Sequence, residues 1–568
     1  DQVADVATGR ERWAPAVPLV LAAAVYTVTA AGRAIADADE GVYVHIPQQM
    51  LARGDWITPY VNGVRSLDKP PLLYWLIALS YTLFGQSEFA ARIPSIAGVC
   101  GVVWLVQRIA GMLAGARAGI AAGLAFAFSV GTFLFTLEVM HDILLVFFLT
   151  LAMYCFVVYE RQGGARPWPV LGFFAAAAGA FLAKGLLGIA LPAGIVAACL
   201  AISRRVPPVR WRWLVLGGLV FAALALPWHL AMEARNPGFL RVYFFEEQVL
   251  RFFGKREPMD YTSVPLPLFW GLIPVWLFPW SAFLPGALFL RGRAALLAGC
   301  WAGFLLAFFS VSSRLEHYAF PLLPPLAILA GTALTEERAR RAAGWGLKFL
   351  RGLGLALAGA AVALALVWIT GYGLPESAGG HPVRTHDRDF SILADFPGEV
   401  VRSLLPPAIA VSLAMAICFL AARRRVVGAL VLAMAVFHGA AAYSIRVAEE
   451  IVSSKAFGQV LARDGRPGDT VIVFGDYETA NSINFYAPLP LYVCEGAAPS
   501  LGPGLRYPDA PRLLLSREDL VRRWRSLDRV WLIADGLQVE ELDLDPAFPI
   551  AESAGRVLVS NRPVTATE

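Results

Sequence analysis

A run of charged residues directly follows the first apolar segment of the chain. It includes Asp39 and Glu40, continues through Asp55, and ends at Asp68 and Lys69. Carboxylates are costly to desolvate at a bilayer surface. A cluster of them with one lysine therefore indicates a functional site, and not simply the solvated end of the first span. A carboxylate can take a proton from an attacking hydroxyl, and a lysine can stabilise a departing phosphate. The run therefore predicts a site for a charged, lipid-borne substrate.

The composition is that of an integral membrane protein. Of the 568 residues, 57% are hydrophobic and 16% are charged, whereas soluble domains carry about 25% charged residues. Apolar stretches long enough to cross about 30 Å of hydrocarbon recur from residue 14 to residue 445 and then stop. The formal charge of +5 is small for this length and points to no nucleic-acid partner. We predict a membrane body at residues 1–445 and a soluble domain at residues 446–568.

Thirteen apolar segments of the body have the length and composition of spans. Arginines such as Arg10, Arg12 and those at 423–425 fall on one side of these spans, which the positive-inside rule assigns, with the N-terminus, to the cytoplasm. Residues 70–84 are also apolar, but counting them would invert every later loop, so we predict an interfacial helix there. The first loop, 37–92, and the soluble domain then face the periplasm. The predicted spans are 14–35, 93–114, 118–137, 142–159, 168–183, 185–203, 213–232, 264–290, 294–311, 318–334, 346–370, 404–422 and 426–445.

Later loops bring more polar residues to the same face. Lys184 interrupts two apolar segments, where a charge costs about 3 kcal/mol on insertion scales, so a phosphate partner is favoured. Simpler alternatives stay open, since Asp142 could cap a helix and Lys69 could extend its amine to the interface. His141 and His317 are more often hydrogen-bonded loop residues than metal ligands. The remaining polar residues predicted at this face are Glu247, Gln248, Arg251, Arg314 and Tyr318.

The soluble domain has an α/β pattern. Short buried strands are predicted at 470–476, 489–495, 512–516 and 529–536, with a helix at 517–526. No dinucleotide fingerprint follows any of them. The domain is expected to cover the active face or to help hold the acceptor, and a purely structural lid is an equal alternative.

Motifs in the first loop carry a family resemblance. They read DEGVY at 39–43, GDWITP at 54–59, NG at 62–63, DKPPLLYW at 68–75 and RIPS at 92–95, and KG at 184–185 and SSRLEHY at 312–318 follow. This order resembles bacterial lipid-linked glycosyltransferases of the protein O-mannosyltransferase superfamily, and most of all the aminoarabinose transferases that modify lipid A. The resemblance implies a GT-C fold, a polytopic α-helical membrane protein with about 13 transmembrane helices and a C-terminal periplasmic α/β domain.

The resemblance also implies roles for individual residues. Asp39 and Asp142 match the acidic positions of the family and are predicted to be catalytic. Lys69, Lys184 and Arg251 match the cations that hold the donor phosphate. Further contacts with the substrate are predicted from Glu40, Tyr43, Asp55, Arg314 and Tyr318.

Several departures from the family pattern concern charge. Val42 stands where the family has an arginine, Asp68 where it often has a glutamate, and Gln248 where it has a histidine. The last two positions are linked in the family to a divalent metal. A metal at Asp68, Glu247 and Gln248 is therefore left open, and no cofactor is predicted with certainty. The identity of the sugar and of the acceptor is also left open.

The sequence thus predicts an inverting glycosyltransferase in the bacterial inner membrane. Its donor is a polyprenyl phosphate sugar, most simply undecaprenyl phosphate-linked, and its partners are membrane lipids and a lipid or glycan acceptor, with lipid A first and a protein hydroxyl second. A lipid-linked sugar transporter would show inverted repeats with charges near mid-membrane, and no such repeat is visible. A membrane-anchored assembly protein would tolerate neutral replacement of the loop acids.

Overall fold

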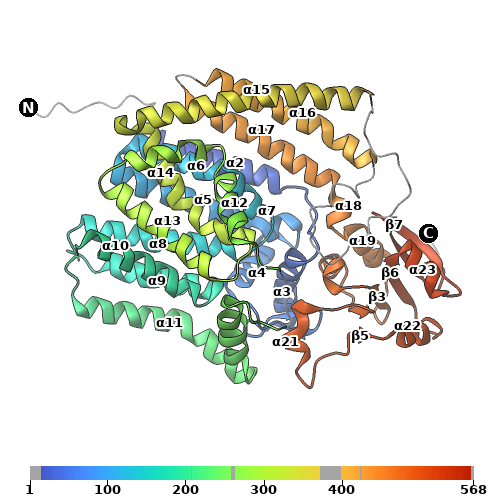
Figure 1. The fold of residues 1–568 in the computed structure, drawn as a ribbon. Helices are drawn as coiled ribbons and strands as arrows, with labels where there is room; N and C mark the ends of the chain where they lie inside the picture. The colour runs from blue at the N-terminus through green and yellow to red at the C-terminus, as the bar shows by residue number, and fades with distance from the viewer. Residues whose placement is uncertain (1–13, 206, 258–261, 371–397, 423–424, 565–568) are drawn as a thin grey trace, which may run out of the picture.

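The computed structural model describes residues 14–205, 207–257, 262–370, 398–422 and 425–564. The topology arginines Arg10, Arg12, Arg423 and Arg424 lie outside these residues. A bundle of apolar helices forms the body, with α15, α16 and α17 along one side and α9, α10 and α11 along the other (Figure 1). Its helices are η1 (Ala14–Ala16), α2 (Val17–Ala30), α3 (Asp39–Arg53), α4 (Leu72–Phe84), α5 (Glu88–Ala114), α6 (Ala116–Ala127), α7 (Val130–Leu137), α8 (Asp142–Arg161), α9 (Trp168–Lys184), α10 (Leu187–Ser203), α11 (Trp211–Arg235), η2 (Arg241–Leu250), α12 (Leu266–Trp276), η3 (Trp280–Phe289), α13 (Arg293–Val311), η4 (Glu316–Leu322), α14 (Leu323–Thr335), η5 (Glu337–Ala339), α15 (Arg340–Thr370), α16 (Gly398–Ala421) and α17 (Val426–Val447).

The apolar segments predicted as spans coincide with helices. Within the described residues, eight helices are long and apolar enough to cross a membrane, and ten if the bent pairs α6 with α7 and α12 with η3 each count as one span. The shorter apolar helices α2, α9 and α10 match the other three predicted spans. Helix α4, which was left out of the span count, has 13 residues, about 20 Å of helix and too short for a bilayer. The number of crossings itself stays a prediction.

The C-terminal region contains a six-stranded sheet, which confirms the predicted α/β class. Its strand order is β5-β4-β3-β6-β8-β7. The first four strands of this order pair in parallel, whereas β8 pairs antiparallel with both β6 and β7. The sequence did not predict β7 and β8, and β7 contains Pro549, which is tolerated only at a sheet edge. The elements are α18 (Glu449–Val452), α19 (Lys455–Asp464), β3 (Thr470–Phe474), η7 (Tyr477–Thr479), α20 (Ile483–Tyr486), β4 (Leu491–Cys494), η8 (Pro499–Leu501), α21 (Gly502–Leu505), β5 (Leu514–Leu515), α22 (Arg517–Trp524), β6 (Val530–Asp535), α23 (Gly536–Leu542), β7 (Phe548–Ser553) and β8 (Arg556–Ser560).

The first loop is held between the helical body and the C-terminal region (Figure 1). Its short hairpin of β1 (Tyr60–Val61) and β2 (Val64–Arg65) turns at Asn62. The buried Asn62 amide donates to the Leu491 carbonyl at 2.7 Å and accepts from the Leu491 N–H at 3.0 Å. The Asn481 amide donates to the Ala38 carbonyl at 2.9 Å. The backbone beside Asp39 is therefore fixed by the C-terminal region.

Substitution of Gly504 by alanine should loosen the packing of the C-terminal region against the first loop. A Cβ at Gly504 would lie 2.0 Å from the Arg65 carbonyl oxygen of β2, whereas one at Gly502, on the same short helix, would meet no atom within 4 Å. We expect Gly504→Ala to destabilise the protein by about 1–3 kcal/mol through overpacking and to speed proteolysis of the C-terminal region. Gly502→Ala is the matched control. Equal melting temperatures and cleavage rates for the two variants would contradict the close packing described here.

Candidate active site

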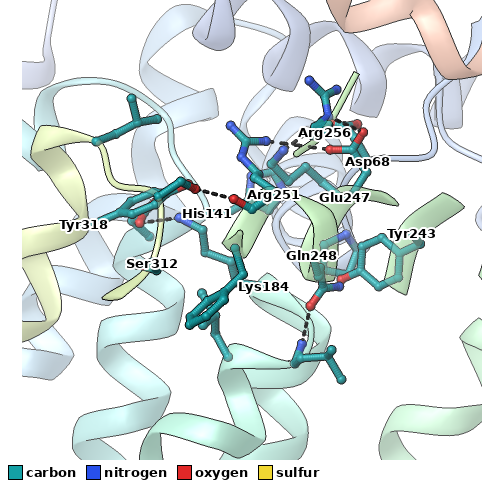
Figure 2. Close-up of a pocket in the computed structure, with 18 of the residues that line it drawn as sticks. Asp68, His141, Lys184, Tyr243, Glu247, Gln248, Arg251, Arg256, Ser312 and Tyr318 are labelled. Carbon is teal, nitrogen blue, oxygen red and sulfur yellow. Dashed lines mark hydrogen bonds and ion pairs between the residues drawn. The ribbon is translucent and has the colours of Figure 1, made fainter. Parts of the chain in front are cut away.

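The first loop, the helical body and the C-terminal region enclose a cavity of about 350 Å³. Most of the residues that were predicted to act together line it, although they come from distant parts of the chain. Figure 2 shows Asp68, Glu247 and Arg256 gathered on one side, Tyr318 on the other, and Lys184 between them. The predicted site residues among its lining are Asp39, Tyr43, Asp68, Lys69, Asp142, Lys184, Glu247, Gln248, Arg251 and Tyr318.

Asp142 and Lys184 form an ion pair where two neighbouring helices meet the cavity. Asp142 is the first residue of α8 and Lys184 the last of α9, and the Lys184 Nζ lies 2.5 Å from the Asp142 Oδ1. An acid at a helix N-terminus and a cation at a C-terminus are both favoured by the helix dipole. The Lys184 amine also lies 5.1 Å from the centre of the Tyr318 ring. Asp142 thus stabilises a cation that faces the cavity.

A second ion pair follows directly from the DKPP motif. The Lys69 Nζ lies 2.8 Å from the Asp68 Oδ2, and the Ser66 hydroxyl donates to the Asp68 Oδ1 at 2.9 Å. Burial acts to raise the pKa of Asp68, but the charge of Lys69 and the hydrogen bonds from Lys69 and Ser66 outweigh it and hold that pKa below its usual range. Burial acts to lower the pKa of Lys69, but the charge of Asp68 outweighs it and raises that pKa. Both side chains are therefore charged at neutral pH.

The π-helix η2 brings a third group of charges to the cavity. Glu247 is paired with Arg256 at 2.7 Å and with Arg251 at 3.7 Å. The Gln248 Oε1 accepts the Leu186 N–H at 2.6 Å, which ties η2 to the turn between α9 and α10. Lysine has three N–H donors and arginine five, so the cations of these pairs keep donors for a further anion. Cations of this kind suit an anionic ligand such as a phosphate, and Lys69, Lys184 and Arg251 all line the cavity.

A metal ion does not fit at Asp68, Glu247 and Gln248, the residues left open as its ligands. Asp68 and Glu247 are each paired with a cation, and the Gln248 oxygen is occupied by a backbone N–H. Among the described residues there is no group of three or more His, Cys, Asp and Glu side chains that could hold a metal. No step is therefore assigned to a metal.

Three residues predicted to contact the substrate are not among the cavity lining. Glu40 is buried in an ion pair with Arg92, at 2.9 Å. Asp55 accepts the Ile57 N–H at 2.9 Å within its own turn. Arg314 donates to backbone carbonyls, including Ser312 at 3.1 Å. Each thus has a structural role outside the cavity.

The cavity also contains residues that the sequence did not single out. Arg256 is 5% exposed and lies outside the sequence motifs that carry the family resemblance. Ser500 and Pro503 come from the C-terminal region, far from the first loop in the sequence. The Glu478 carboxylate accepts from both the N–H and the hydroxyl of Ser500, at 2.9 and 2.6 Å. Arg256 lies between Lys255 and Glu257 in a polar stretch, and nothing in the sequence indicated Arg256 or Ser500.

Comparisons with known proteins agree with the predicted resemblance. The family model described as dolichyl-phosphate-mannose-protein mannosyltransferase matches residues 68–230. The undecaprenyl phosphate-alpha-4-amino-4-deoxy-L-arabinose arabinosyl transferase of Pseudomonas paraeruginosa is 33% identical over 56% of this chain and 59% of that protein. The enzyme of the same name from Pectobacterium carotovorum is 30% identical over 62% of this chain and 65% of that protein. The match thus spans about three fifths of the length of these relatives.

A comparison of structures covers nearly the whole chain. The crystal structure of ArnT from Cupriavidus metallidurans bound to undecaprenyl phosphate matches with a TM-score of 0.78 over 98% of both chains, at 24% identity. The structure of the same protein in the apo state matches with a TM-score of 0.77. The predicted fold is therefore confirmed, and the chain is a membrane protein with the GT-C fold of ArnT.

Proposed function

We propose that the protein is an inverting glycosyltransferase that moves a sugar from a polyprenyl phosphate to an acceptor of the cell envelope. The observation that carries this proposal is the cavity itself, whose lining includes the carboxylates Asp39 and Asp142 and the cations Lys69, Lys184 and Arg251. The relatives named as arabinosyl transferases and the ArnT structure bound to undecaprenyl phosphate support this donor. The predicted donor is therefore undecaprenyl phosphate-linked 4-amino-4-deoxy-L-arabinose.

The reaction follows from the charges around the cavity. The three cations hold the donor phosphate, whose negative charge grows as the bond to the sugar breaks. Asp39 takes the proton of the acceptor hydroxyl, whose oxygen forms a bond to the anomeric carbon. The bond from that carbon to the phosphate oxygen breaks, and its electron pair leaves with the polyprenyl phosphate. Attack opposite to the leaving group inverts the anomeric configuration.

Sidedness and domain division belong to the same proposal. The arginine distribution supports an N-terminus in the cytoplasm and a cavity on the periplasmic face. The donor then enters from the outer leaflet, and the acceptor lies on the same face, with lipid A as the proposed acceptor. Residues 1–445 form the membrane domain, and residues 446–568 form a periplasmic domain that supplies one wall of the cavity.

A transfer assay tests the proposal. Purified protein in lipid nanodiscs receives synthetic undecaprenyl phosphate carrying the radiolabelled aminoarabinose, together with lipid A. We expect label in lipid A and an equal amount of sugar-free undecaprenyl phosphate. Lys184→Met should lower the rate by at least about tenfold because a charge-assisted contact to phosphate is lost, while Arg522→Leu, on the exposed helix α22, serves as control. Absence of transfer from this donor and from a mannosyl donor would contradict the proposal.

A further inference from the structure

His141 is a polar side chain buried in the cavity wall. It is 1% exposed, lines the cavity, and directly precedes Asp142. Within the part of the chain that the structure describes, neither of its ring nitrogens has a hydrogen-bond partner. Leaving a buried polar group without a partner costs about 1–3 kcal/mol. The site therefore contains hydrogen-bonding capacity that the protein itself does not use.

Two tyrosines fix the orientation of the His141 ring. The rings of Tyr43 and Tyr74 meet it edge to face, with centroid distances of 4.7 and 5.2 Å and interplanar angles of 86° and 87°. Edge-to-face packing of this kind is a preferred geometry for aromatic pairs. Among the residues that the structure describes, ring packing and not a hydrogen bond thus holds the imidazole in place, as it would for a preorganised recognition group.

Other histidines of the chain show what a structural role looks like. The His45 Nδ1 lies 3.1 Å from the Gln48 Oε1, and the His229 Nδ1 lies 2.8 Å from the Ala225 carbonyl oxygen. Unpartnered nitrogens alone do not make a site, because those of His438 lie among phenylalanine rings in the helical body, away from the cavity lining. His141 differs because it lines the cavity where the substrate is proposed to bind.

The imidazole of His141 is uncharged at neutral pH. Burial lowers its pKa to about 3, and the charge of Lys69 acts in the same direction. A neutral imidazole donates one hydrogen bond and accepts another. That combination suits a hydroxyl or amino group, which can both accept and donate, better than it suits an anion.

We propose that His141 hydrogen-bonds the sugar of the lipid-linked donor and is a specificity-determining residue for that sugar. The inference rests on the proposed function, which assigns Lys69 and Lys184 to the donor phosphate. Both of these cations act electrostatically on His141. In a donor whose phosphate is bound between these cations, the sugar is attached directly to a phosphate oxygen. The hydroxyl or amino groups of a pentose or hexose are therefore the ligands that His141 can reach.

A pair of affinities tests this assignment. Wild type and His141→Phe are compared for binding of undecaprenyl phosphate and of undecaprenyl phosphate-linked aminoarabinose in detergent. Phenylalanine keeps a ring between Tyr43 and Tyr74 but has no nitrogen. We expect unchanged affinity for the sugar-free lipid, which also shows that the variant is folded, and about tenfold weaker affinity for the sugar-linked lipid. His141→Asn, which keeps a donor and an acceptor, should recover part of the loss.

The other outcomes are distinct. An equal loss for both lipids would assign His141 to the phosphate or to packing and would overturn the inference. Unchanged affinity for both lipids would overturn it as well, while leaving the proposed function intact. A wild-type protein that binds neither lipid would overturn the proposed function, and this inference with it.

Discussion

Replacement of Asp39 by asparagine is expected to lower the rate of sugar transfer by about 10²–10⁴-fold, the usual contribution of a general base. Asp39 lines the cavity and is exposed to it. Asparagine has nearly the same shape but cannot take the proton of the acceptor hydroxyl. Single-turnover transfer measures the rate, and binding of sugar-free undecaprenyl phosphate, which is expected to stay unchanged, measures the donor site.

The control for this variant is Asp37→Asn, two residues earlier in the same loop. The Asp37 carboxylate accepts from the Ser482 N–H at 3.0 Å and from the Ser454 hydroxyl at 2.8 Å, and it does not line the cavity. We expect a rate close to that of wild type. A full rate for Asp39→Asn would remove Asp39 from the chemistry and leave Asp142 as the remaining candidate for the catalytic base.

Replacement of Arg92 by leucine is expected to have the largest effect on stability. The Arg92 guanidinium contacts Glu40 at 2.9 and 3.1 Å and donates to the carbonyls of Arg33 and Ala34, both at 2.7 Å. The side chains of Arg92 and Glu40 are 1% and 0% exposed. Removal of one partner leaves an uncompensated buried charge, which costs about 3–5 kcal/mol. Thermal unfolding in detergent should show a large decrease in melting temperature.

An exposed ion pair provides the comparison for Arg92. Arg522 pairs with Asp519 on α22, with its side chain 77% exposed, and such pairs contribute about 0–1 kcal/mol. Arg522→Leu should therefore melt close to wild type. The double variant Glu40→Leu/Arg92→Leu removes both charges and should recover much of the stability lost in Arg92→Leu. Equal melting temperatures for Arg92→Leu and Arg522→Leu would show that the buried pair is not needed for the fold.

Hydropathy predicted the helical body well because each span must satisfy its own backbone in lipid. It could not predict breaks inside two of the segments. Helix α6 ends at Ala127 and α7 starts after a 48° bend, and α12 and η3 meet at 100°. The strands β7 and β8 were also missed, since short antiparallel strands at a sheet edge have little sequence signal. Bends and edges depend on what packs against them, which local sequence does not contain.

The sequence predicted the charged residues of the candidate site better than it predicted the contacts that these residues make. Asp39 and Glu40 have the same chemistry and are neighbours in sequence, yet Asp39 is exposed and Glu40 is buried. Successive residues of a helix point about 100° apart, so α3, which starts at Asp39, turns Glu40 toward Arg92 and away from the cavity. The pairing of Glu247 with Arg256, and the wall formed by Ser500, arise only from tertiary contacts.

The π-helical geometry of η2 makes the length of this segment as important as its residues. Its hydrogen bonds join residues five apart instead of four, and a helix of this kind holds an extra residue relative to α-helical winding. If the segment rewound as an α-helix without losing a residue, the extra residue would rotate everything after it by about 100° around the axis. Arg251 would then leave the cavity although no side chain had been substituted. A relative with a single-residue gap within η2 is thus expected to have an α-helix there and to keep the arginine that follows it in the donor site.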